Sequence, residues 1–146
     1  MIGFALCGSF CTLSRSVSIL RDLKTAGCDV LPIMSEITAA TNTRFGDAAD
    51  FIRQVESICG RPIVRTIPDA EPLGPSIPLE ALLICPCTGN TLAKIANGIT
   101  DTPVCMAAKA HLRSDRPLLI TLASNDTLSA NLRNIGTLLS RKNVYF

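Results

Sequence analysis

The amino-acid sequence predicts an α/β fold in which helices cover both faces of a six-stranded, mainly parallel sheet. Three observations support this prediction. Short apolar runs alternate with stretches of helical periodicity, most of the runs are apolar throughout, and glycine follows several of the helical stretches. Parallel sheets wrapped by helices show this alternation, because their strands are buried on both faces. With 146 residues, 47% of them hydrophobic, the chain is expected to form one domain over residues 1–146.

Six segments combine the length and the apolar character of buried strands. They are residues 2–7, 29–34, 62–67, 81–85, 117–122 and 143–146. In a doubly wound sheet, ligands bind outside the carboxyl ends of the strands. The residues that directly follow each strand are therefore the first place to look for a site.

Four helices are predicted from apolar residues that recur at intervals of three and four. The inward-facing residues are Leu13, Val17, Leu20 and Leu23 in the first helix, Phe51, Ile52, Val55 and Ile58 in the second, and Leu128, Leu132, Ile135 and Leu139 in the last. Gly27, Gly60 and Gly98 are predicted to end the first, second and third helices, because glycine readily adopts the left-handed conformation of a helix C-terminus.

Turn-forming residues predict where these helices begin. The second helix is expected to start near Gly46 or Asp47, the third to span residues 90–97, and the last to start at Asp126. About five helices are expected in all, and the sequence contains no internal repeat.

Two segments fit neither a regular helix nor a strand. Residues 38–45 are polar and turn-prone, and residues 68–78 contain four prolines. Loops of this kind carry function more often than cores do. The alternative is that both segments only connect neighbouring elements.

The charge balance argues against a nucleic-acid partner. Fourteen Lys and Arg residues stand against twelve Asp and Glu, and neither sign forms a long run. The apolar run at residues 2–6 is too short for a secretory signal or a membrane span, so no membrane partner is expected. Seven cysteines, an odd number without a secretory leader, favour a reducing cytoplasm over a disulfide framework.

Small and hydroxyl-bearing residues follow the first two predicted strands. Gly8 and Ser9 stand at a helix start, where free backbone N–H groups and the helix dipole favour a phosphate. Ser35 follows the second strand and could donate its hydroxyl to a ligand. For Ser9 and Ser35 alike, the alternative is an ordinary helix cap.

The turn after the fourth predicted strand is the most informative stretch. Pro86 is expected to end the strand, and Gly89 to let the backbone approach a ligand closely. Thr88, Asn90 and Thr91 can supply neutral hydrogen bonds, which suit the edge of a polar ring or a ribityl chain better than a metal.

A zinc site at Cys85 and Cys87 is the competing interpretation of this stretch. Two thiols one residue apart and a single histidine, His111, make a poor tetrahedral ligand set, so these thiols are predicted to be core residues and no metal is expected.

A further small polar turn, made of Ala123, Ser124 and Asn125, follows the fifth predicted strand. Asn125 is its candidate ligand contact. The alternative is that Asn125 or Asp126 starts a helix through an Asx turn.

The segment PCTGNTLAKIANGITDTPV at residues 86–104 resembles the central motif of the flavoprotein family that includes cysteine decarboxylases and flavin prenyltransferases. The resemblance covers essentially the whole chain. It implies a three-layer α/β/α sandwich of Rossmann-like or flavodoxin-like type. It also implies a homo-oligomer that binds flavin mononucleotide (FMN) between subunits, with the phosphate at Gly8 and Ser9. The other implied contacts are Ser35, Thr88, Gly89, Asn90, Thr91, Ala123, Ser124 and Asn125.

Within this family, TNTRFG at 41–46, AEPLGP at 70–75 and TDTPVCMAAKAHLRSDRP at 100–117 resemble the dipicolinate synthase branch. The resemblance implies a B-type subunit that acts with an A subunit carrying a nicotinamide (NAD or NADP) site. Together they would oxidise dihydrodipicolinate, a small dicarboxylate, in the mother-cell cytoplasm of a sporulating bacterium. Members of the branch continue beyond the point where this sequence ends, which implies a further C-terminal segment.

Arg44 is the predicted substrate-binding residue, because its planar guanidinium can hold a carboxylate bidentately. The alternative is an exposed loop arginine. No catalytic residue is assigned, which leaves open a non-catalytic, flavin-carrying assembly partner. A stand-alone decarboxylase or prenyltransferase is a further alternative. Against it, the chain has no histidine before His111 and no basic residue between Thr121 and Asn131, where those enzymes use such groups.

Overall fold

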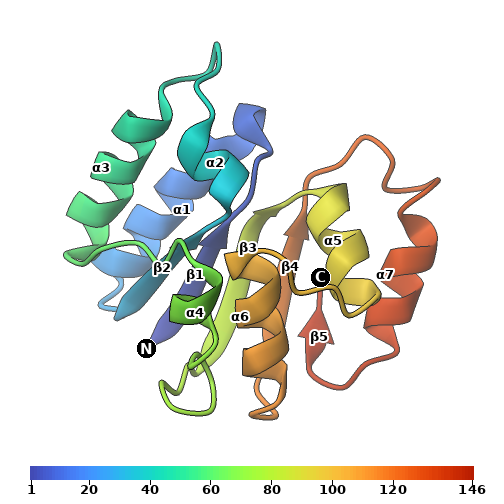
Figure 1. The fold of residues 1–146 in the computed structure, drawn as a ribbon. Coiled ribbons are helices and arrows are strands. Elements are labelled where there is room, and N and C mark those ends of the chain that lie inside the picture. The colour runs from blue at the N-terminus through green and yellow to red at the C-terminus, as the bar shows by residue number, and fades with distance from the viewer.

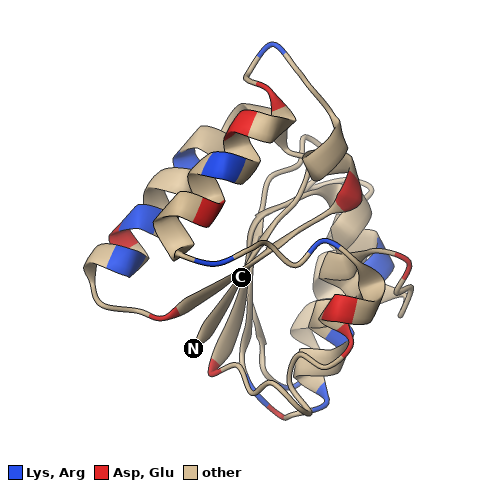
Figure 2. Cartoon of the chain, turned by 60° about the vertical axis from the view of Figure 1, so that its left-hand side comes forward, with Lys and Arg blue, Asp and Glu red and all other residues tan.

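The computed structural model describes residues 1–146 and contains a parallel sheet of five strands with helices on both faces (Figures 1 and 2). The strand order is β2-β1-β3-β4-β5, and every neighbouring pair is parallel. The strands are β1 (Ile2–Leu6), β2 (Val30–Met34), β3 (Ala81–Cys87), β4 (Leu118–Leu122) and β5 (Val144–Tyr145). The predicted fold class is therefore confirmed, with five strands in place of six.

Seven α-helices and one short 3-10 helix connect the strands. They are η1 (Phe10–Thr12), α1 (Leu13–Thr25), α2 (Glu36–Ala40), α3 (Ala48–Cys59), α4 (Ile67–Ala70), α5 (Gly89–Ala96), α6 (Pro103–Leu112) and α7 (Leu132–Leu139). Charged residues lie on the helices and loops, and the strands carry none (Figure 2). No helix has the length and apolar character needed to cross a membrane.

Two hydrophobic clusters lie on opposite faces of the sheet. Phe4 and Leu6 of β1 pack with residues of α1 and α3, whereas Ala5 and Cys7 belong to the cluster that includes residues of α5, α6 and α7. Successive residues of a strand point to opposite faces, so an uninterrupted apolar run supplies both clusters. This explains why the strands were recognisable in the sequence.

The prediction of a strand at residues 62–67 is wrong. Only Val64 pairs with β2, through the Met34 N–H to Val64 carbonyl bond of 3.0 Å and the Val64 N–H to Pro32 carbonyl bond of 2.9 Å. Pro62 has no N–H to extend the ladder. On the other side, the Thr66 hydroxyl accepts a hydrogen bond from the Asp69 N–H and thereby starts α4.

Pro86 does not end its strand, which corrects a second prediction. The Cys85–Pro86 peptide is cis, and the pairing of β3 with β4 shifts register between Ile84 and Cys87. Pairing resumes at Cys87 with Leu122, and the Pro86 carbonyl accepts a 3.2 Å hydrogen bond from the Cys7 N–H. The register shift accommodates Pro86, which has no backbone N–H to donate, and the strand continues to Cys87.

The predicted helix ends are confirmed at all three glycines. Gly27, Gly60 and Gly98 have φ values of +85°, +69° and +72° and follow α1, α3 and α5. The predicted start of α3 is also confirmed, although the Asp47 side chain forms no cap. The cap comes instead from Asn42, whose side-chain oxygen accepts a 2.9 Å hydrogen bond from the Ala48 N–H.

The last helix starts six residues later than predicted. Residues 126–131 form turns in which the Asp126 carbonyl accepts hydrogen bonds from the N–H groups of Ser129 and Asn131, at 3.2 and 3.0 Å. Leu128, predicted to face inward, is 85% exposed, and Leu132 and Leu139 are also exposed. The buried residue of α7 is Leu138.

Three helices were not among those placed from the sequence. The predicted loop at 38–45 overlaps the end of α2, and the loop at 68–78 overlaps α4, both of which are only one turn long. The third, α6, begins after Thr102, whose hydroxyl accepts a hydrogen bond from the Cys105 N–H.

Candidate functional site

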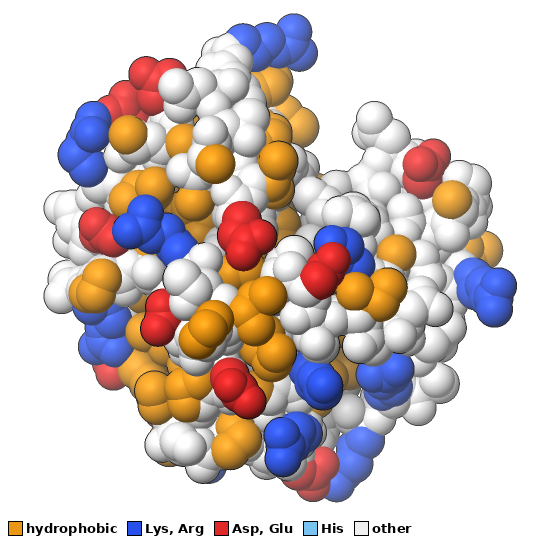
Figure 3. Space-filling view, viewed as in Figure 1, with side chains coloured by type: hydrophobic (Ala, Val, Ile, Leu, Met, Phe, Trp, Pro, Cys, Tyr) orange, Lys and Arg blue, Asp and Glu red, His pale blue; other side chains and the backbone are white.

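A cleft opens at the carboxyl edge of the sheet, between the part that carries α2 and α3 and the part that precedes α7 (Figure 3). It consists of two hollows of about 670 and 510 Å³ that share Gly8. The larger hollow is lined by the predicted residues Gly8, Ser35, Thr88, Asn90 and Thr91. The smaller one is lined by Gly8, Ser9, Arg44, Ala123, Ser124 and Asn125. Only Gly89, among the predicted residues, lines neither hollow.

The turn after β1 lines the cleft and contains two polar groups without a partner in the chain. The Ser9 hydroxyl makes no hydrogen bond within the chain and does not cap the helix that follows. The Gly8 N–H also has no partner. Helix η1 is held by the Ser9 backbone carbonyl instead, which accepts from the N–H and the hydroxyl of Thr12 at 3.0 and 2.9 Å. The alternative that Ser9 is an ordinary side-chain cap is therefore wrong.

At Ser35 the capping alternative is confirmed. Its hydroxyl accepts a 3.4 Å hydrogen bond from the Thr38 N–H and lies 2.7 Å from the Thr38 hydroxyl. Both side chains are buried. Ser35 therefore starts α2 and forms part of the floor of the larger hollow.

The turn after β3 uses its hydroxyls internally. The Thr88 hydroxyl accepts a 3.2 Å hydrogen bond from the Thr91 N–H and lies 3.0 Å from the Thr91 hydroxyl, so it caps α5. Asn90 is exposed, and its side-chain amide has no partner in the chain. Of the three predicted donors at this turn, Asn90 is the one with a free side chain.

The structure gives Gly89 a packing role. A Cβ atom at this position would lie 2.5 Å from Nδ2 of Asn131 and 2.9 Å from Oγ of Ser124, closer than such atoms can approach. The glycine therefore allows α5 to pack against the turns before α7. The side of Gly89 that would carry a Cβ faces the protein itself, and the approach of its backbone to a ligand stays a prediction.

In the turn after β4, Ser124 serves the local structure. Its hydroxyl accepts hydrogen bonds from the Asp126 N–H at 3.2 Å and from Nδ2 of Asn131 at 3.3 Å. Neither Asn125 nor Asp126 makes the side-chain bond that an Asx turn requires. Asn125 is exposed and free to contact a ligand in the smaller hollow.

Arg44 lies in the loop between α2 and α3, which projects beyond the carboxyl edge of the sheet (Figure 1). A backbone pairing between Thr43 and Gly46 closes this loop. The guanidinium lies 4.9 Å from the centre of the Phe45 ring and forms no ion pair. Arg44 is exposed, as the alternative predicted. It also lines the smaller hollow, together with residues of the turn after β4.

Sequence reasoning did not select three charged residues of the larger hollow: Glu36, Lys94 and Asp101. The Lys94 ammonium group bonds to the Asp101 carboxylate at 2.9 Å, and this hydrogen bond raises the pKa of Lys94. One signal was present in the sequence, because Lys94 lies three residues after Thr91 and therefore shares its helical face.

Cys7, Cys85 and Cys87 are core thiols, whereas Cys11 is exposed and lines the smaller hollow. Cys85 and Cys87 belong to different hydrophobic clusters, and all seven cysteines are unpaired. Burial raises the pKa of Cys7 to about 12 and also raises that of Cys87. Thiols in this state are poor nucleophiles and poor metal ligands at neutral pH, as expected for the core interpretation.

Comparisons with known proteins identify the family and the fold. The family described as Flavoprotein matches residues 1–145. The chain is 41% identical over 145 residues to the dipicolinate synthase B subunit of Bacillus subtilis (strain 168), covering 99% of this chain and 72% of that protein. The crystal structure of the dipicolinate synthase B subunit from Bacillus halodurans C superimposes with a TM-score of 0.88 at 39% identity, covering 99% of this chain and 74% of that one.

A more distant structure shares the fold alone. The crystal structure of AnUbiX (PadA1) in complex with FMN and dimethylallyl pyrophosphate has a TM-score of 0.78 at 20% identity. It covers 99% of this chain and 74% of that chain.

Proposed function

The chain belongs to the Flavoprotein family, and we propose that it binds FMN in the cleft and acts as the B subunit of a dipicolinate synthase. The identity of 41% to the Bacillus subtilis protein, over nearly the whole chain, supports the choice within the family. The structural observation that carries the proposal is the pair of unpartnered groups at the turn after β1, the Ser9 hydroxyl and the Gly8 N–H.

The residues of this turn fit a phosphate. A backbone N–H and a hydroxyl donate to phosphate oxygens in many anion sites at helix starts. Gly8 lines both hollows of the cleft, and a Cβ at this position would already lie 3.3 Å from Cγ2 of Ile37, so a side chain here would narrow the approach to the backbone. We therefore assign the FMN phosphate to Gly8 and Ser9.

Neutral side chains would hold the rest of the cofactor. Asn90 from α5 and Asn125 from the turn after β4 offer free amides, and Thr88 and Thr91 keep lone pairs available beyond their mutual bond. Bound FMN supplies hydride-transfer chemistry, while the protein orients it and controls its surroundings. Ser35 shapes the floor, and Gly89 and Ser124 hold the walls together.

Arg44 is proposed to bind a carboxylate of the substrate. Its guanidinium is unpaired and sits at the rim of the smaller hollow, where a planar dicarboxylate could enter. The Phe45 ring lies beside it, with its centre 4.9 Å from the guanidinium carbon.

The Arg44 assignment is tested by Arg44→Ala, assayed with the A subunit and dihydrodipicolinate. Loss of a bidentate charged hydrogen bond should lower kcat/KM by about tenfold to a hundredfold. Arg65→Ala is the matched control, because Arg65 is exposed and lines no part of the cleft. Normal turnover by the Arg44 variant would remove Arg44 from the site.

FMN binding itself is tested by titrating the purified chain with FMN and following heat and visible absorbance. A saturable signal supports the proposal, and its absence contradicts it. Adding the substrate to the FMN-loaded chain alone, and then with an NAD- or NADP-dependent A subunit, separates a catalytic subunit from a supporting one. Oxidation only in the presence of the partner would support the heteromeric enzyme. Gel filtration of the same samples tests the expected homo-oligomer.

A further inference from the structure

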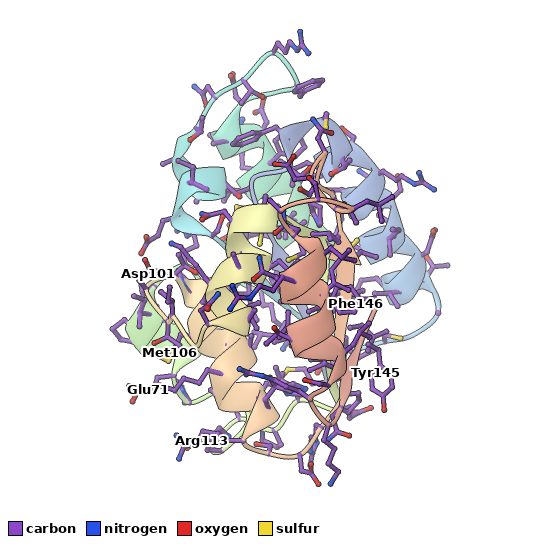
Figure 4. The ribbon with its side chains drawn as sticks, turned by 90° about the vertical axis from the view of Figure 1, so that its right-hand side faces the viewer. Glu71, Asp101, Met106, Arg113, Tyr145 and Phe146 are labelled. Carbon is purple, nitrogen blue, oxygen red and sulfur yellow. The ribbon has the colours of Figure 1, made fainter.

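A second cavity lies on the face of the sheet that α5, α6 and α7 cover, apart from the cleft. It has a volume of about 340 Å³ and shares no lining residue with either hollow of the cleft. Its walls come from the end of α5, the following loop, one side of α6 and the residue Arg141 after α7. Figure 4 looks onto these helices and shows Arg113 at the end of α6.

The inner wall of this cavity is apolar. Ile95 and Cys105 are buried, Leu112 is half-buried, and Ile99 is 47% exposed at the mouth. Burial raises the pKa of Cys105, so its thiol behaves as a small apolar group. Such a surface gains free energy when an apolar ring or chain covers it.

Three cations surround this apolar wall: Lys109, Arg113 and Arg141. No acidic residue lines the cavity, and none of the three cations takes part in an ion pair. Neighbouring Lys94 and Lys142 differ in this respect, since each is paired with an aspartate. The Arg141 guanidinium donates a 3.1 Å hydrogen bond to the Ala96 carbonyl, which fixes its position and leaves its other donors free.

We propose that this cavity binds a small organic anion with a flat apolar body and one or two carboxylates. The apolar wall accommodates the body, and the unpaired cations bind the carboxylates, with each arginine able to do so bidentately. The volume lies at the lower end of the range for small-molecule sites. Inorganic anions would satisfy the cations and leave the apolar wall uncovered, so they are the weaker ligands.

The test uses benzoate and benzene-1,3-dicarboxylate as probes, with sulfate as the charge-only comparison. Calorimetry at low salt should show both aromatic carboxylates binding about tenfold or more tightly than sulfate, because only they cover the apolar wall. Methyl NMR should show shifts at Ile99 and Leu112. If sulfate bound as tightly as the aromatic carboxylates, binding would depend on surface charge alone, and the proposal would be wrong.

A double variant, Lys109→Gln with Arg113→Gln, removes two cations and keeps Arg141 as the link to α5. Affinity for both aromatic probes should fall about tenfold or more. The control is Arg21→Gln, an exposed arginine of α1 without an ion-pair partner, which should leave affinity unchanged. Unchanged binding by the double variant, or shifts at Ile37 of the cleft instead of Ile99, would overturn the proposal.

The same carboxylate group is also found on acidic side chains of other proteins. Titration with the free aromatic acids distinguishes a small-molecule site from a site for such a side chain. A small-molecule site binds the free aromatic acids. If neither probe perturbs Ile99 or Leu112 up to millimolar concentration, the small-anion proposal fails. FMN titration of the double variant should match that of the unmodified chain, which shows that the cleft is intact.

Discussion

The turns after β1 and β3 have nearly the same composition and use it in opposite ways. Each pairs a glycine with a hydroxyl residue: Gly8 with Ser9 in the first turn, and Thr88 with Gly89 in the second. The Ser9 hydroxyl is free, and a Cβ at Gly8 would meet only side-chain atoms of Ile37 and Phe10, at 3.3 and 3.5 Å. The Thr88 hydroxyl caps α5, and the Gly89 face is filled by Asn131 and Ser124. The Ser9 hydroxyl of the first turn is available to a ligand, whereas Thr88 and Gly89 of the second turn already make contacts within the protein and leave Asn90 as its free side chain.

The difference arises from what each turn must stabilise. Helix α5 begins directly after Thr88, so its first N–H groups need a side-chain cap. Helix α1 is preceded by η1, whose own backbone bonds already satisfy part of this need. A hydroxyl that is not required for capping can contact a ligand without loss of stability.

Thiol modification should show the largest contrast. Cys11 lies just after the first turn, is exposed and lines the smaller hollow, whereas Cys7 and Cys87 are buried behind the two turns. With the pKa of Cys7 raised to about 12, almost no thiolate exists at pH 8. Iodoacetamide should therefore modify Cys11 at least about a hundredfold faster than either buried thiol. Peptide mass spectrometry after short exposures measures these rates.

FMN should slow the modification of Cys11 and leave Cys28 unaffected, because Cys28 lies outside the cleft. Comparable rates at Cys11 and Cys87 would show that the turn after β3 opens as readily as the first. That result would remove the contrast between them.

Gly89→Ala should be the most destabilising substitution in either turn. The added methyl group would overlap Asn131 and Ser124, and overpacking of this kind costs about 1–3 kcal/mol. Gly8→Ala meets only Ile37 at 3.3 Å and ring atoms of Phe10 at 3.5 Å, so its effect should be smaller. Urea unfolding of both variants measures the difference, and equal losses of stability would contradict the packing role of Gly89.

Thr88→Ala should lower the free energy of unfolding by about 1 kcal/mol, the usual effect of removing a helix cap. Thr88→Ser keeps the hydroxyl and should restore most of the loss. Chemical denaturation of the unmodified chain and of the two variants measures their free energies of unfolding. An alanine variant as stable as the original would mean that the hydroxyl does not cap α5 in solution.

Ser9→Ala should have the smallest effect on stability, within about 0.5 kcal/mol, because its hydroxyl has no partner in the chain. Its FMN affinity should fall about tenfold through the lost hydrogen bond to the phosphate. Ser14→Ala, at an exposed position of α1, is the matched control for both measurements. Unchanged FMN affinity would remove Ser9 from the phosphate site.

Several features could be predicted from the sequence because their causes are local. The glycines that end α1, α3 and α5 act through their own backbone conformation, and the apolar strands supply both faces of the sheet whatever their neighbours are. Because the strands are parallel, their carboxyl ends meet at one edge. This is why ten of the eleven predicted site residues line one cleft.

Other features depend on residues far apart in the chain. The need for glycine at position 89 comes from Asn131, more than forty positions later in the chain. Residues 62–67 do not form a strand, because only Val64 pairs with Ile33 of β2 and α4 starts directly afterwards. The hydroxyls of Ser9 and Thr88 look equivalent in the sequence, and their hydrogen-bond partners distinguish them. Chain geometry over a few residues follows from residue type, whereas the partner of a hydrogen bond or a packing contact is settled only when distant segments meet.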